Sequence, residues 1–410
     1  MTKKTILFIT TSFIVVLSCM REVSPNSECA IDQSTYQVTK SDAVEVTHSF
    51  FINHCQKAFV KSNASSNDSF FSLRKNNTTY AYAVNFSDGG FAIVSADKRM
   101  NPILAYSETG NINADTSTYP TGFLIWLNDV IAEYEAIIEG HYDEEVAIKN
   151  SLMWNKMLAG SETRSIPVDP SLPDLIDTTV GPLLSTYWYD NTPFINYLPP
   201  HYDTTGIQDR EHVWAGSSTV SVARLLHYHQ HPSSFNWSSM PLTIASNDTT
   251  DYPSLFGLYS DVFSKIDNFK GFNRYYEYTA VKEVFYLDLF LKNQYGFTSA
   301  TQINYNRNSN IVKSELLDHM RPVVFSGDLE YNVMGPRQYW ICDGVHAFED
   351  VVYDETGQPH INGYLYFHES WMRYGFPPVW LGHANFTLGS IHGTPISYSK
   401  NMRLVYQIIP

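Results

Sequence analysis

The densest group of side chains that could bind a metal is the histidine triplet His227, His229 and His231. Imidazole is the commonest metal ligand in proteins. The triplet stands at the expected end of a helix, where residues two apart point to different faces. The helix dipole at that end favours a protonated histidine. We therefore expect helix-end histidines here and no metal site, and no other motif indicates a metal or a cofactor.

Cysteine is the second residue type that could do chemistry, because its thiolate is a strong nucleophile. Cys342 lies inside the apolar run 339–342. Burial raises the pKa of a thiol and leaves little thiolate, so we expect an inert core residue. Cys29 and Cys55 could pair in an oxidising compartment, and their spacing does not settle the pairing.

The first residues have the pattern of an export signal. Lys3 and Lys4 precede an apolar run over 6–17 that is too short to span a bilayer. The run ends in Val-Leu-Ser-Cys, which resembles the lipobox of bacterial lipoproteins and makes Cys19 the lipid attachment site. We expect residues 1–19 to be a lipoprotein signal, with an ordinary signal peptide as the alternative. The protein is then exported and held at the bacterial cell envelope by an N-terminal lipid only, on the periplasmic face or the cell surface.

Composition and charge exclude two further classes. The 410 residues are 43% hydrophobic and include 24 Phe, 28 Tyr and 8 Trp, which excludes disorder as the main state. The 27 basic and 42 acidic residues give a net charge of −15, and no basic tract is present to bind nucleic acid. The aromatic content would suit a glycan- or peptide-binding groove, although Tyr and Trp are equally core residues.

Two domains are expected from this length, separated by a linker. In the first, over 28–158, apolar positions at helical spacing predict a helix over 43–60. Two strand-like runs, 80–86 and 91–96, flank a Ser-Asp-Gly-Gly turn and predict a hairpin. An amphipathic helix is predicted over 123–138.

The remaining boundaries come from composition. The acidic run 143–145 is typical of a solvated helix start. Residues 159–175 are rich in Gly, Ser, Thr and Pro and predict the linker. Residues 176–410 carry more aromatic and strand-like runs and form the second domain.

The hairpin sequence, 80–86 through 90–97, resembles the propeptide of the streptopain family of bacterial cysteine peptidases, which includes interpain A and the PrtT-type thiol proteases. The similarity continues through 102–107 and the helix around Trp126. It resumes at 180–188, where the family's catalytic domain begins. The resemblance implies an α+β fold, with a papain-like peptidase domain preceded by an inhibitory prodomain of antiparallel sheet plus helices.

The family's catalytic pair is replaced in this chain. The nucleophilic cysteine of the family opens a helix; the matching stretch is 216–232, and Ser217 stands in the cysteine's place. The family's histidine precedes an Asp-Gly pair by five residues, and here Gln338 stands five residues before Asp343. The strand 322–327, which precedes the histidine in the family, is kept and supports this register.

Two more catalytic positions differ from the family. Asp190 stands where the family has a glutamine that helps to form the oxyanion hole, and a carboxylate would repel the developing charge. The family's His-x-Asn-Trp-Gly-Trp aligns with 368–373, so that Ser370 replaces the asparagine and Trp371 keeps the first tryptophan.

These replacements predict a protein that binds and does not hydrolyse. A serine hydroxyl needs a base to take its proton, and a glutamine amide is not one. Loss of one member of such a pair costs roughly 10⁶ in turnover. The expected partners are a peptide or protein ligand in the vestigial cleft, or active streptopain-type peptidases inhibited in trans by the prodomain. The residues expected to line the cleft are Trp188, Ser217, Gln338, Trp340 and Trp371.

Three alternatives stay open. Ser217 could be an active nucleophile served by a displaced base, with His346 and His368 as candidates. The 217–219 hydroxyls could simply cap the helix. A surface glycan- or peptide-binding lipoprotein would rest on the aromatic content alone.

Overall fold

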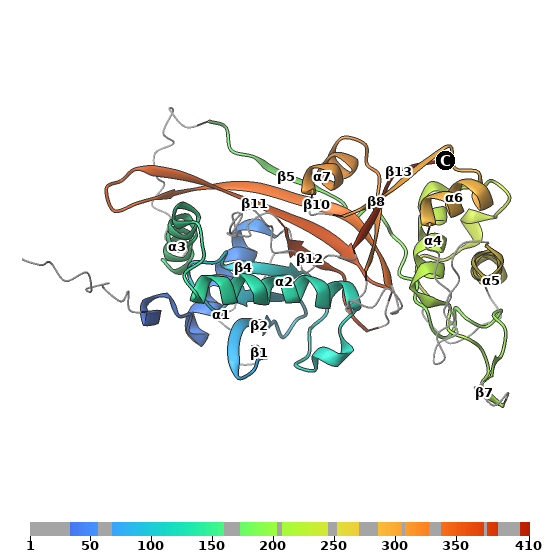
Figure 1. Ribbon diagram of the computed structural model, residues 1–410, viewed down its shortest axis with the longest axis horizontal. Coiled ribbons are helices and arrows are strands. Elements are labelled where there is room, and N and C mark those ends of the chain that lie inside the picture. Colours follow the sequence, from blue (N-terminus) through green and yellow to red (C-terminus); the bar gives the residue numbers. More distant parts are fainter. Residues whose placement is uncertain are drawn as a thin grey trace, which may run out of the picture. The chain divides into compact units, whose positions relative to one another are not determined.

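One antiparallel sheet runs through the described part of the chain (Figure 1). The computed structural model describes residues 33–55, 68–159, 173–202, 207–244, 252–269, 286–305, 308–327, 338–372, 375–383 and 402–410. In order across the sheet its strands are β1 (Ser69–Lys75), β2 (Thr78–Asn85), β3 (Phe91–Ser95), β4 (Ile103–Ser107), β12 (Val379–Gly382), β11 (Pro359–Ser370), β10 (Gln338–Tyr353), β9 (Val323–Gly327), β13 (Arg403–Ile409) and β8 (Ser299–Asn304), with β5 (Asp177–Val180) also paired to β10. A separate two-stranded sheet consists of β6 (His201–Tyr202) and β7 (Gln208–Arg210).

Two helices of the N-terminal region begin at side-chain caps. Thr39 and Asp42 form a capping box at the first helix, and the Asp143 side chain accepts from the N–H groups of Glu145 and Val146, which confirms the acidic run as a helix start. The helices are α1 (Lys40–His54), α2 (Thr121–Ile138), α3 (Glu144–Leu158), α4 (Gly216–His229), α5 (Pro253–Asn268), α6 (Leu287–Tyr295) and α7 (Ser309–Leu317), with 3-10 turns at Gln33–Tyr36, Thr116–Thr118 and Trp237–Ser239. Among the described residues, no helix is long and apolar enough to cross a bilayer.

The predicted elements of the N-terminal region are present. The hairpin is β2 and β3, and the amphipathic helix is α2. The helix expected over 43–60 is α1, which starts earlier and ends at His54; residues 56–60 lie outside the described ones.

Helices cover both faces of the sheet in this region. On β3, Phe91 and Ile93 point into the core shared with α2, while Ala92 and Val94 point into the core shared with α1 and α3. The side chains alternate because successive residues of a strand face opposite sides. Helices α4, α5 and α6 pack together around a third core, which includes buried residues of β10 (Figure 1).

The sheet joins the two predicted domains. Tyr106 and Ala105 of β4 pair with Trp380 and Leu381 of β12. The Tyr366 hydroxyl of β11 donates a 2.7 Å hydrogen bond to the carbonyl of Ile103. Tyr36–Pro410 accordingly form one compact unit. The boundaries at 158 and 176 stay a prediction.

Candidate functional site

Ser217 lies in the first turn of α4, against the beginning of β10. Its Oγ accepts a 3.0 Å hydrogen bond from the backbone N–H of Tyr339. The side chain is half-buried. The structure therefore brings Ser217 next to the start of β10, whose first residue is Gln338.

Gln338 is the first residue of β10 and is also half-buried. Its Oε1 accepts a 3.0 Å hydrogen bond from the backbone N–H of Thr121. Thr121 is the first residue of α2, where a backbone N–H has no partner within the helix. Gln338, which was expected at the family's base position, is thus an amide bound to a helix start from the N-terminal region.

Serine capping does not explain the start of α4. The N-cap is Ala215, and no side chain caps the helix, so the capping alternative for 217–219 is wrong. The Ala215 N–H instead donates a 3.0 Å hydrogen bond to the carbonyl of Asp190. The backbone of Asp190, a half-buried residue, is therefore hydrogen-bonded to the start of the helix.

The three tryptophans expected in the cleft are buried. The Trp188 indole N–H donates to the carbonyl of Pro241. Trp340 and Trp371 are 3% and 4% exposed, and their ring centroids are 5.9 Å apart. A Cβ at Gly122 would lie 2.7 Å from Trp371 and 2.8 Å from Trp340, so α2 needs a glycine to approach this pair. In this conformation the tryptophans are packing residues, as is Ser370 at the end of β11.

The two histidines considered as displaced bases are bonded elsewhere. Nδ1 of His346 is 2.7 Å from the hydroxyl of Tyr106, and Nδ1 of His368 is 2.6 Å from Oδ1 of Asp343. Among the described residues, no histidine nitrogen hydrogen-bonds to Ser217. In these geometries neither His346 nor His368 is bonded to the Ser217 hydroxyl.

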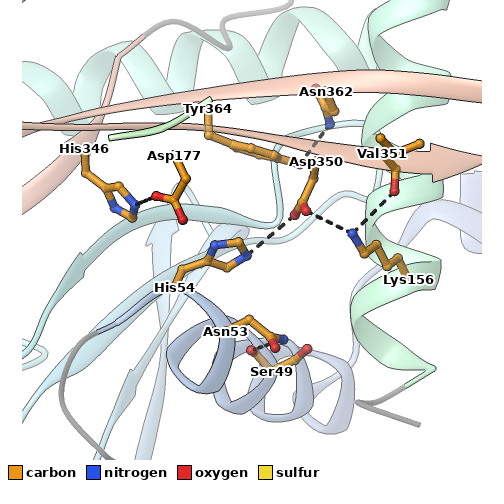
Figure 2. Close-up of polar contacts among 10 residues, drawn as sticks. All are labelled: Ser49, Asn53, His54, Lys156, Asp177, His346, Asp350, Val351, Asn362 and Tyr364. Atoms are coloured by element: carbon orange, nitrogen blue, oxygen red, sulfur yellow. Dashed lines mark hydrogen bonds and ion pairs between the residues drawn. The ribbon is translucent and has the colours of Figure 1, made fainter. Parts of the chain in front are cut away.

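His346 belongs to a polar group between β10 and the N-terminal region. Figure 2 shows its ring facing Asp177 of β5 at 3.9 Å, while His54 of α1 lies 3.5 Å from Asp350. Lys156 of α3 donates a 3.0 Å hydrogen bond to the same carboxylate. Burial, and next the neighbouring His54, lowers the pKa of His346 to about 4. The imidazole is therefore neutral at pH 7.

The histidine triplet is half-buried at the end of α4, and Cys342 is a core residue. Burial lowers the pKa of His229 to about 4, with His231 and Arg321 adding to the effect, so the expectation of a protonated histidine there is wrong: burial outweighs the helix dipole. No group of three or more potential metal ligands occurs in the described parts of the chain. Cys342 is fully buried and its pKa is raised by burial, as expected. Cys19 and Cys29 lie outside the described residues.

Sequence reasoning missed Thr121 as a member of the site. It lies 217 positions from Gln338, and only its place at a helix start distinguishes it. The sequence places Pro120 just before the helix, but no local pattern indicates what the first N–H groups of the helix contact.

Comparisons with known proteins identify the N-terminal domain and the fold. Residues 35–134 match the model of the Spi protease inhibitor family. A search of curated protein sequences found no match. Nine chains of solved structures match. One is a fragment of prointerpain A from Prevotella intermedia, a cysteine-to-alanine mutant, with a TM-score of 0.50 and 16% identity over 84% of this chain and 99% of that chain.

The matched residues include α1, the strands β1 to β4 and the part of α2 that contacts Gln338. The α+β fold class, with its large antiparallel sheet, agrees with the expectation. The chain thus carries a Spi protease inhibitor domain, the prodomain type of streptopain-like proteases, in a mixed α+β fold similar to that of prointerpain A.

Proposed function

We propose that this protein is a catalytically degenerate homologue of the streptopain-type peptidases, with a papain-like domain behind its Spi domain, and that it acts by binding. The observation that carries the proposal is the pair of hydrogen bonds at the two catalytic positions. Ser217 accepts from the Tyr339 N–H, and Gln338 accepts from the Thr121 N–H. Neither contact activates a nucleophile, because a backbone N–H takes no proton from the hydroxyl and the amide is bound to a helix start.

Hydrolysis is tested on residues 20–410, the exported chain without its lipidated cysteine, with unfolded casein as substrate. We expect no cleavage above that of a Ser217→Ala variant. Cleavage that disappears in Ser217→Ala would establish the alternative, an active hydrolase with a displaced base. A second variant, His368→Gln, would then show whether the histidine beside Asp343 supplies that base.

The match to the Spi family favours inhibition as the form that binding takes. We propose that the Spi domain inhibits active streptopain-type peptidases in trans. The alternative form of binding is a peptide or protein ligand in the vestigial cleft. In the chain itself the start of α2 is held by Gln338. Action in trans therefore requires this contact to open.

Removal of the Gln338 acceptor tests whether the contact with Thr121 must open for inhibition in trans. We expect the full chain to slow an active streptopain-type peptidase at micromolar concentration, and Gln338→Ala to slow it more. The control is Gln358→Ala, which removes an exposed amide from the turn between β10 and β11. If neither the parent nor Gln338→Ala slows the peptidase, inhibition in trans is wrong.

The place of action is proposed from the N-terminal sequence. Lipidation at Cys19 would hold the protein at the bacterial cell envelope. Expression in a bacterial host with labelled fatty acid should give a labelled, membrane-associated protein, and Cys19→Ala should give neither. Equal labelling of the two proteins would contradict the proposal.

A further inference from the structure

A partly enclosed cavity of about 50 Å³ lies between α2 and the strands β9 to β12. Its described lining does not include Ser217 or Gln338, so it is a site separate from the catalytic positions. A water molecule needs about 10–15 Å³ on this measure. The cavity therefore has room for a group of a few non-hydrogen atoms.

Aromatic rings form much of its wall. Trp126 comes from α2, Phe325 from β9 and Trp340 from β10. The Phe325 and Trp340 rings are stacked with centroids 5.9 Å apart. Such π-systems attract cations at their faces.

Two carboxyl groups line the same cavity. Glu369 of β11 is 4% exposed, and its Oε2 has no hydrogen-bond partner among the described residues. The neighbouring side chains of Cys342 and Trp340 act to lower its pKa, but burial outweighs them. Asp129 of α2, 8% exposed, supplies the second carboxyl. A buried polar atom without a partner costs free energy that a bound donor would recover.

The charges of the lining residues indicate that the ligand is a cation. No lysine or arginine is among the described residues that line the cavity. A metal ion is a poor fit, since no group of three potential metal ligands occurs in the described residues. Acidic groups beside aromatic rings instead suit an organic cation.

We propose that this cavity binds a guanidinium group, held by Glu369 and Asp129 between aromatic walls. A guanidinium has four non-hydrogen atoms, and it is flat. Its N–H groups match the geometry of a carboxylate, and it stacks on aromatic rings. It is also more weakly hydrated than an ammonium group, so it enters a buried site with a smaller loss of hydration.

Binding should release a proton. Burial, and next the charge of Asp343, raises the pKa of Glu369 to about 8, so without a ligand this carboxyl is mostly protonated at neutral pH. The titratable groups that face it are Cys342 and Asp343 of β10, Asp129 of α2 and His383 after β12. A bound cation favours the carboxylate, so affinity should rise as the pH increases from 6 to 9.

Calorimetric titration of the exported chain with methylguanidinium tests the proposal. The comparison ligands are methylammonium, which is a cation of another shape, and N-methylurea, which is flat and neutral. We expect saturable binding of methylguanidinium at least about tenfold tighter than of either comparison ligand. Heats measured in buffers of different ionisation enthalpy should reveal the released proton.

Variants identify the cavity as the site. Glu369→Gln should weaken methylguanidinium binding at least about tenfold and abolish the proton release. If Glu369→Gln does not fold by circular dichroism, Asp129→Asn serves as the second variant, with the same expected loss of affinity. The matched control is Glu133→Gln, which removes a buried carboxyl from the same helix outside the cavity lining.

Two results would overturn the proposal. One is the absence of saturable methylguanidinium binding to the folded parent protein. The other is binding that Glu369→Gln, or Asp129→Asn, leaves unchanged. Arginine with both its amino and carboxyl ends blocked distinguishes two sources of the guanidinium group. If it binds more tightly than methylguanidinium, the ligand is an arginine side chain of a peptide. If it binds more weakly, the ligand is a free guanidino compound.

Discussion

Two buried side chains, Glu369 and His346, have pKa values shifted in opposite senses by the same cause. Burial disfavours the charged form, so it raises the pKa of a carboxyl and lowers that of an imidazole. Glu369 is raised to about 8 and His346 is lowered to about 4. Each residue is neutral near pH 6. Charging Glu369 as the pH rises, and charging His346 as the pH falls, should each lower the stability of the folded protein, and the two effects oppose each other where their pH windows overlap.

Glu369→Gln should flatten the alkaline side of this profile. An unfolded glutamate titrates near 4.3, so between that pH and about 8 the folded state holds the extra proton. Raising the pH through this window then lowers the free energy of unfolding, by up to about 4 kcal/mol at about 1.4 kcal/mol per pKa unit. Urea unfolding at pH 5 and pH 8 measures the difference. Glu355→Gln, at an exposed glutamate, should keep the parent's slope, and an unchanged slope in Glu369→Gln would contradict the shift.

His346→Gln should remove the loss of stability that charging this imidazole causes as the pH falls. The unfolded imidazole titrates near 6.5 and the folded one near 4, so the unfolded state holds the extra proton in between. Stability should therefore fall as the pH decreases through this window, by up to about 3 kcal/mol. Glutamine keeps a hydrogen-bonding group for Tyr106 without the titration. His141→Gln, at an exposed histidine, is the control; equal acid sensitivity of the two variants would refute the assignment to His346.

At the scale of elements, α2 connects the Spi domain to the rest of the chain. Its first N–H holds Gln338, its second residue lies against two tryptophans, and its later turns line the cavity with Glu369. A change in how α2 packs should therefore affect both the contact with Gln338 and the cavity beside Glu369.

Gly122→Ala tests the close approach of α2. The added methyl would lie within 2.8 Å of two indole rings, which must move. We expect a loss of about 1–3 kcal/mol in stability, typical of overpacking. Gly257→Ala in α5 is the matched control, since a Cβ there meets no atom within 4 Å and should stabilise the helix by up to about 1 kcal/mol. If both variants are stabilised, the contact described at Gly122 is wrong.

How far the sequence predicts these elements depends on the range of the interactions. Local periodicity and turn chemistry located β2, β3 and α2, because caps and alternation act over a few residues. The sequence did not predict that β4 pairs with β12, nor that Thr121 contacts Gln338, because such contacts join segments that share no local pattern. The sequence also did not predict which aromatic rings are buried. Trp188 and Trp340 were expected in a cleft, but both are buried, because tertiary packing decides whether an aromatic ring is buried or exposed.

For the whole molecule, the shared sheet predicts how the chain behaves when it is cut. A protease site inserted within residues 160–172 would separate the Spi domain from the rest in sequence only. We expect the two pieces to elute together in size-exclusion chromatography and to separate in denaturant, because β4, β12 and α2 still hold them. The uncut protein is the control, and separation under native conditions would mean that the shared sheet contributes little.

The junction between β4 and β12 has a consequence for any event that removes the Spi domain. Only two residue pairs are in register there, so the contact is short. Departure of the domain would expose the edge of β12, with backbone groups free to pair with a strand from another protein. Release of the Spi domain would therefore leave a free strand edge on the remaining protein, to which a strand of another protein could bind.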